Sequence, residues 1–195
     1  MFRKADSATP SGQTLLNKSA SRGFQKQVAK QFPGADEASI AELFGKHQVV
    51  QWKLPGRCLA YCLKEEEKRA PVPLFLDLSG RRDLCPTVFA LWRCPRLLPA
   101  VLVPSAVSGY LLNGADLMFP GVLSGRAQLG EFAKGARAAV YVWGNPAAVG
   151  VGEWTVASKD LADPPSDMRG KALAMIHTYR DALWSAPFRP ALVPC

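Results

Sequence analysis

The apolar residues of this chain come in short runs that are cut by proline and glycine. The most apolar stretch, residues 97–107, is interrupted by Pro99 and Pro104. No run reaches the roughly 18 to 20 residues that a membrane-spanning helix requires, so no membrane partner is expected. Short runs between turn residues are typical of strands and short helices around small cores. With 195 residues, 48% of them hydrophobic, the chain can form two small globular domains.

The first half mixes helical and strand patterns. An amphipathic helix is expected from about residue 18, capped by Ser19 or Ser21 and ended by Pro33-Gly34. A short helix follows at 36–44, and three strands are expected at 48–54, 58–63 and 74–78. Pro86, three residues after Asp83, indicates one more helix with proline in its first turn, which Cys94-Pro95 ends.

The second half has more small residues and shorter β-rich runs. A strand at 101–103 and a helix at 105–112 are predicted, the helix ending at a left-handed Asn113-Gly114 pair. Residues 138–143 and 147–154 form a predicted hairpin around Gly144-Asn145-Pro146. A helical turn at 158–161 and a last strand at 171–177 complete the pattern. Short strands in close succession indicate a small β-barrel with helical plugs.

Charge is unevenly divided between the two halves. The chain carries 24 Lys and Arg against 16 Asp and Glu, a net charge of +8. Residues 1–97 hold 16 basic and 9 acidic side chains, whereas the remainder holds 8 and 7. A basic half beside a nearly neutral half indicates that the first half docks on a polyanion, and nucleic acid is the commonest such partner.

Four basic residues within that half recur at every fourth position: Lys18, Arg22, Lys26 and Lys30. Phe24, Val28 and Phe32 recur at the same interval in a complementary phase. At about 100° per residue an α-helix would place the two sets on different sides, the apolar set inward and the basic set outward. The four cations, called the basic row below, are either a binding face or a solvated face without a partner; the charge of the whole half favours binding.

No catalytic, metal or cofactor motif is present. The chain has two histidines, His47 and His177, both interpreted as structural, and it lacks zinc-protease, phosphate-loop and dinucleotide-binding motifs. Its five cysteines are dispersed, and only Cys58 and Cys62 are close in sequence, so reduced core thiols are expected rather than a zinc site. The sequence therefore predicts a protein that is not an enzyme and that needs no cofactor.

Four blocks carry a specific resemblance. They are DLCPTVFALWRCPRLLP at 83–99, NGADLMFPGV at 113–122, AAVGVGEWTVAS at 147–158 and IHTYRDALW at 176–184. In this order and spacing they resemble the N-terminal half of ligatin, an unconventional eukaryotic initiation factor whose start is similar to the malignant T-cell amplified sequence protein. MFRK at 1–4 and KQFPG at 30–34 fit the same family. One departure is that Ala136 and Arg137 stand where the family usually has an acidic residue.

The resemblance implies an α+β fold: a small N-terminal α/β domain at 1–97, a PUA-type pseudo-β-barrel at 98–186 and a tail at 187–195. It implies a cytoplasmic RNA-binding translation factor that binds the small ribosomal subunit, places tRNA in the P site without the GTP-dependent carrier, and releases tRNA and mRNA after termination. The later ligatin domains are absent from these 195 residues, so either the sequence is a fragment or a truncated gene model, or a density-regulated-type partner supplies the missing domain. Two alternatives are an RNA-modification factor or enzyme subunit, because PUA domains often accompany such enzymes, and a protein-interaction adaptor.

The resemblance also locates an RNA-binding segment between Gly114 and Gly121. Its implied site residues are Gly114, Ala115, Asp116, Met118, Pro120 and Gly121. Glycines allow a close approach of backbone amides to a phosphate or base edge. Met118 or Phe119 could form an apolar platform for the terminal base of a tRNA acceptor end. The alternative is that the segment only connects a helix to a strand, with Leu117 and Met118 in the core.

Overall fold

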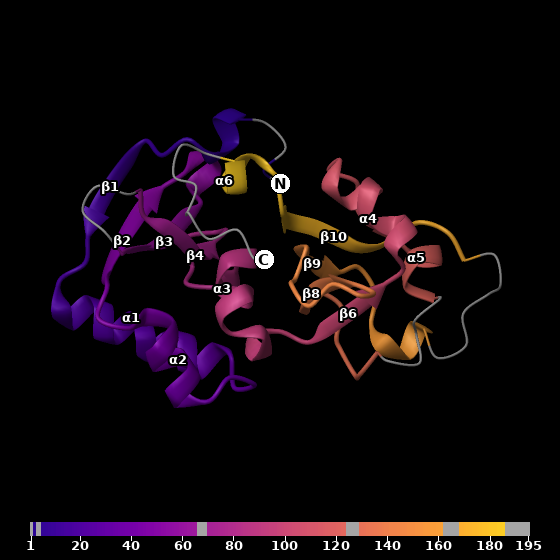
Figure 1. The fold of residues 1–195 in the computed structure, drawn as a ribbon, viewed down its shortest axis with the longest axis horizontal. Helices are drawn as coiled ribbons and strands as arrows, with labels where there is room; N and C mark the ends of the chain where they lie inside the picture. The colour runs from indigo at the N-terminus through magenta and orange to yellow at the C-terminus, as the bar shows by residue number, and fades with distance from the viewer. Residues whose placement is uncertain (1, 3–4, 66–69, 124–128, 162–167, 186–195) are drawn as a thin grey trace.

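The computed structural model describes residues 2, 5–65, 70–123, 129–161 and 168–185. These residues form two lobes side by side, each built on a five-stranded sheet (Figure 1). The N lobe comprises the first sheet and the helices before residue 98, and the C lobe comprises the second sheet with the helices between its strands. The predicted α+β class is confirmed. The predicted tail at 187–195 lies outside the described residues.

The N-lobe sheet is an antiparallel meander in the order β1-β2-β3-β4-β5. Its strands are β1 (Gly12–Leu15), β2 (Gln48–Lys53), β3 (Leu59–Lys64), β4 (Val72–Asp77) and β5 (Leu84–Pro86). Its helices are α1 (Lys18–Gln31), α2 (Glu37–Phe44) and α3 (Val88–Arg93), with 3-10 turns η1 (Ala5–Ala8), η2 (Pro55–Arg57) and η3 (Pro95–Leu97).

An aromatic cluster holds α1 on this sheet. Phe24 of α1 stacks on Tyr61 of β3 with ring centroids 4.1 Å apart, and it meets Phe44 and Phe75 edge-on at 5.8 and 5.9 Å. Val28 is fully buried beside it, and Phe32 is buried just after the helix ends. Each such side chain contributes about 1.5–3 kcal/mol through burial, so the apolar side of α1 fixes the helix on the sheet.

The C-lobe sheet has the order β6-β8-β9-β10-β7, with β6 and β8 parallel and the other pairs antiparallel. Its strands are β6 (Ala100–Val103), β7 (Leu117–Met118), β8 (Arg137–Val142), β9 (Gly150–Trp154) and β10 (Lys171–Thr178). Helices α4 (Ser105–Leu112), α5 (Phe119–Leu123) and the 3-10 turn η5 (Ser158–Leu161) connect them. The predicted hairpin is β8 and β9, and the curled sheet with its short helices is the expected pseudo-barrel.

The two lobes share a hydrophobic core. Ala148, Val151, Ile176 and Leu183, which follow the first lobe in sequence, belong to the same buried cluster as the N-lobe core. Trp92 of α3 donates a hydrogen bond from its Nε1 to the Ala148 carbonyl, 2.9 Å away. Helix α6 (Ala182–Ser185) crosses back to the N lobe, where the Ala182 amide bonds to the Phe2 carbonyl at 2.8 Å (Figure 1). Dense packing across this boundary holds the lobes together.

Three local predictions were wrong. The cap of α1 is Asn17, whose Oδ1 accepts from the Ala20 amide at 2.8 Å, rather than Ser19 or Ser21. Pro86 lies in strand β5 and not in a helix, and α3 starts after Thr87, whose hydroxyl caps it. At the end of α4 only Gly114 is left-handed, with φ of 85°, while Asn113 has φ of −87°. The edge strand β1 was not predicted.

Candidate nucleic-acid interface

The basic row lies on the solvent side of α1. Lys18, Arg22, Lys26 and Lys30 are all exposed, while Phe24 and Val28 on the opposite side are buried. Twelve residue-to-residue steps of about 1.5 Å each spread the row over about 18 Å of helix. Among the described residues, no carboxylate forms an ion pair with any of the four. The predicted separation of the two sides is confirmed, and the row is available to an anion.

The C-terminal end of α1 is tied to the β4–β5 loop. Gln27 and Gln31 both donate side-chain hydrogen bonds to the Arg82 carbonyl, at 2.9 and 2.6 Å. The Gln31 Oε1 also accepts the Leu84 amide at 3.0 Å. Because these bonds fix the loop against the helix, the exposed Arg81 and Arg82 lie beside the end of the basic row.

Two backbone hydrogen bonds close helix α4 at Gly114. Its own amide bonds to the Leu111 carbonyl at 2.9 Å, and the amide of the half-buried Ala115 bonds to the Tyr110 carbonyl at 3.0 Å. With Gly114 at φ of 85°, this pattern is a Schellman motif, in which glycine takes the left-handed position without steric cost. Gly114 is thus needed for the helix end whatever the segment binds.

Asp116 joins the segment to β10. Its Oδ1 accepts the Met175 amide at 2.8 Å, and its Oδ2 forms an ion pair with the Lys171 Nζ at 2.7 Å. Both carboxylate oxygens are therefore engaged within the C lobe. The side chain positions the segment on the sheet.

The segment alternates between the core and the surface. Leu117 and Phe119 are buried, whereas Met118 is 48% exposed and Pro120 is exposed. Of the two predicted platforms, Met118 is therefore at the surface and Phe119 is not. A Cβ placed on Gly121 would lie 3.1 Å from a Leu117 methyl and 3.3 Å from a Val107 methyl, so this glycine permits α5 to pack against α4.

Two basic residues that the sequence did not single out lie beside Met118. Strand pairing puts Lys171 opposite Met118, and the exposed Arg169 precedes it in the same approach to β10. Met118, Pro120, Arg169 and Lys171 are called the C-lobe patch below. The MRGK run at 168–171 was the only sequence signal for this basic pair, and without the β7–β10 register nothing connected it to Met118.

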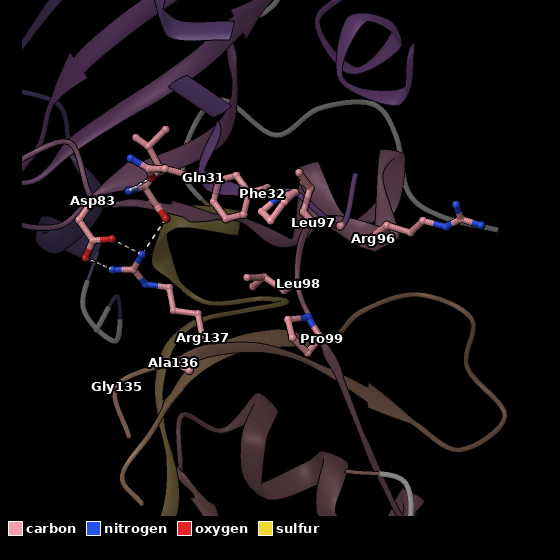
Figure 2. Close-up of a pocket in the computed structure, with 13 residues that line it drawn as sticks. Gln31, Phe32, Asp83, Arg96, Leu97, Leu98, Pro99, Gly135, Ala136 and Arg137 are labelled. Carbon is pink, nitrogen blue, oxygen red and sulfur yellow. Dashed lines mark hydrogen bonds and ion pairs between the residues drawn. The ribbon is translucent and has the colours of Figure 1, made fainter. Parts of the chain in front are cut away.

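A cleft of about 710 Å³ lies between the lobes, bounded by the end of α1, by η3 and by the start of β8. Figure 2 shows Arg137 extending across to Asp83, whereas Arg96 points away from the cleft. Burial alone would lower the pKa of the Arg137 guanidinium, but its hydrogen bonds to Asp83 and the surrounding negative charge raise that pKa above its usual range. The residue that departs from the family pattern thus forms an ion pair between the lobes.

The described residues contain no cluster of metal-binding side chains. No three His, Cys, Asp or Glu side chains among them are placed to hold a metal ion. His177 is buried with its Nδ1 2.7 Å from the Asp181 Oδ2, as expected for a structural histidine, and His47 is exposed. Of the helices the structure describes, none has the length and apolar content to cross a bilayer.

Two family descriptions match consecutive parts of the chain. Residues 2–95 match the Pre-PUA-like domain, and residues 98–182 match the PUA domain of eukaryotic translation initiation factor 2D (eIF2D). The rat eIF2D is 32% identical over 174 residues, which cover 86% of this chain and 27% of the relative. Human malignant T-cell-amplified sequence 2 is 26% identical, with 94% of this chain and 97% of the relative covered.

Solved structures give the same fold. A hypothetical protein from the archaeon Pyrococcus horikoshii matches with a TM-score of 0.64 and 20% identity, covering 90% of this chain and 99% of that protein. A conserved PUA domain protein from Thermoplasma acidophilum matches with a TM-score of 0.61 and 21% identity, over 90% and 99%. The C lobe therefore has a PUA-like curled sheet.

The relatives differ in length from this chain. The chain spans less than a third of the initiation factors that it matches but nearly all of the shorter T-cell-amplified sequence protein. The two consecutive matches, the two-lobed fold and these identities agree with one another. The chain belongs to the family of pre-PUA and PUA proteins that includes the N-terminal part of eIF2D and the malignant T-cell-amplified sequence proteins.

Proposed function

We propose that this protein is an RNA-binding translation factor that binds the small ribosomal subunit through the basic row on α1. The observation that carries the proposal is the row itself: four exposed cations on one face of a helix, with no ion-pair partner among the described carboxylates. Such a face suits the phosphates of rRNA, whose contacts provide affinity without sequence choice. The relatives named as translation initiation factors support the same process.

The C-lobe patch is the second contact in this proposal. Met118 provides an apolar surface for a terminal base, and the exposed Arg169 provides positive charge for the adjoining phosphate, while Lys171 is held in its ion pair with Asp116. The patch would bind the acceptor end of a tRNA while α1 contacts the subunit, so that tRNA is placed in or released from the P site in the cytoplasm. A density-regulated-type partner belongs to the same proposal, and co-purification tests it.

Charge reversal on α1 tests the proposal. The triple variant Arg22→Glu, Lys26→Glu, Lys30→Glu should weaken binding to purified small subunits and lower the slope of log affinity against log salt by about two to three. Its melting temperature should barely change because all three side chains are exposed.

A control of equal charge reverses Lys46, Lys134 and Lys159, which are exposed elsewhere. If both triple variants bind as the unmodified protein does, the basic row does not bind the subunit. Equal loss in both would indicate that only net charge matters. An assay for modified nucleosides in bulk tRNA addresses the alternative that the chain serves an RNA-modifying enzyme.

A further inference from the structure

Three non-glycine residues of the described chain have a left-handed backbone, and all three are arginines. Their φ angles are 63° at Arg57, 64° at Arg82 and 68° at Arg180. A side chain with a Cβ is strained in this region, where glycine and asparagine are the usual occupants. Arginine at these positions brings no conformational benefit, so what it adds over glycine is the guanidinium group.

Arg57 and Arg82 lie in neighbouring loops at the same end of the N-lobe strands, and this end of the sheet is called the edge below. The register pairs Leu59 at the start of β3 with Asp77 at the end of β4, which brings the loops next to these positions together. A Cβ on Gly80 would lie 3.7 Å from the Arg57 carbonyl oxygen. Arg81 is in the second loop, and all three arginines are exposed.

Hydrogen bonds from buried and helical groups fix the second loop. The carboxylate of Asp77, a fully buried residue, accepts the Arg82 amide at 2.8 Å. On the other side of the same residue, the Arg82 carbonyl accepts the two bonds from Gln27 and Gln31. The strained backbone of Arg82 is therefore held from both the sheet and α1.

The described acidic residues next to this edge bond to other groups, since the Asp77 carboxylate accepts backbone amides. The next acidic residue in sequence, Asp83, is paired with Arg137. None of Arg57, Arg81 and Arg82 forms an ion pair with a carboxylate in the part of the chain that the structure describes. Because Gln27 and Gln31 join the loop to α1, these charges continue the basic row past Lys26 and Lys30.

We propose that Arg57, Arg81 and Arg82 form a phosphate-binding edge that grips the backbone of a folded RNA next to the basic row. Guanidinium groups bind phosphate with paired, planar hydrogen bonds. An acidic protein partner fits less well, because protein interfaces have apolar centres and the exposed large apolar residues of the described chain, Leu15, Tyr110, Met118 and Trp143, lie outside both loops. This inference rests on the proposed function and extends its surface.

Glycine substitution separates charge from folding at this edge. Arg57→Gly with Arg82→Gly removes two charges while the new residues adopt positive φ without strain, so the melting temperature should stay the same or rise. Binding to purified small ribosomal subunits and to a short RNA duplex should weaken about tenfold, and the salt slope should fall by about 1.5 to 2. Arg82→Asn, which also tolerates positive φ, should reproduce half of the slope change.

Arg180→Gly is the matched control. It removes the same charge from the same backbone conformation, but in the turn after β10, where the guanidinium lies 5.4 Å from the centre of the Tyr179 ring. Its RNA affinity and salt slope should match those of the unmodified protein.

The outcomes distinguish the two proposals. Unchanged binding in the glycine variants, with binding lost on reversal of the α1 row, would overturn the edge and leave the proposed function standing. Unchanged binding in both sets would overturn both. Loss of binding to a polyglutamate peptide, with RNA binding intact, would assign the edge to an acidic protein and overturn this inference.

Discussion

Arg137 at the start of β8 donates hydrogen bonds to both carboxylate oxygens of Asp83, at 2.7 and 2.5 Å, and a third to the Leu84 carbonyl at 2.7 Å. The guanidinium side is nearly buried, with 13% of its side chain exposed, whereas Asp83 is 65% exposed. The pair connects the C lobe to the end of the N-lobe sheet. Solvent around Asp83 screens the ion pair, but the burial of Arg137 limits this screening.

Asp83→Asn should lower the free energy of unfolding by about 1–2 kcal/mol, because it leaves a mostly buried guanidinium with weaker acceptors. Urea denaturation measures the change. Glu131→Gln, at an exposed acidic residue of the C lobe, is a control for charge alone. An unchanged unfolding midpoint for Asp83→Asn would mean that solvent screens the pair completely.

Met118→Ala with Arg169→Ala should weaken tRNA binding about threefold to tenfold and leave binding to the small subunit intact. Both side chains are at the surface, so the fold should tolerate their loss. The measurement compares intact tRNA with tRNA that lacks its terminal nucleotides. Equal binding of both tRNAs by the unmodified protein would count against an acceptor-end site.

Bulky substitution of Gly121 cannot serve the same purpose. Its added atoms would press on Leu117 and Val107, and such overpacking costs about 1–3 kcal/mol. A loss of tRNA binding in that variant would therefore report damage to the C lobe.

The raised pKa values of two buried cysteines predict that the free energy of unfolding falls at alkaline pH. Burial raises the pKa of Cys58 and Cys85 to about 12, from an ordinary value of 9.0. The contribution of these two thiols to the free energy of unfolding is therefore fully present below pH 9.0. It is lost as the pH rises toward 12, because the unfolded chain releases these protons at a lower pH than the folded chain does. Each thiol adds a slope of about 1.4 kcal/mol per pH unit within that window.

Urea denaturation at increasing pH measures this slope, and Cys58→Ala should reduce it by the share of one thiol. Maleimide labelling is an independent check, since thiols held in the protonated form react slowly until the protein unfolds. Native labelling at the rate seen in urea would contradict the prediction.

The amphipathic pattern of α1 could be predicted because it depends on residues within the same helix. The cap could not be chosen from sequence, since Asn17, Ser19 and Ser21 are all good capping residues and the start of the packed face decides among them. Pro86 was misplaced because proline suits both a first helical turn and an edge strand, and β5 is at the sheet edge. Strand β1 is exposed over Gln13–Leu15 and forms only through pairing with β2, a contact remote in sequence.

The candidate sites divide in the same way. Exposure of the basic row followed from helical periodicity alone. The neighbourhood of Arg57 with Arg82, and of Lys171 with Met118, depends on strand register, which no local pattern specified. The family resemblance assigned Gly114, Asp116 and Gly121 to an RNA-binding segment, and their contacts show that each supports the fold. RNA binding by the segment stays a prediction.

The packing of Trp92 against Ala148 and the return of α6 to the N lobe make hinge motion between the lobes costly. The distance from helix α1 to Met118 is consequently fixed before any ligand binds. An RNA assembly that presents its two contacts at that spacing gains the second one with little further loss of entropy, whereas one with another spacing engages a single contact.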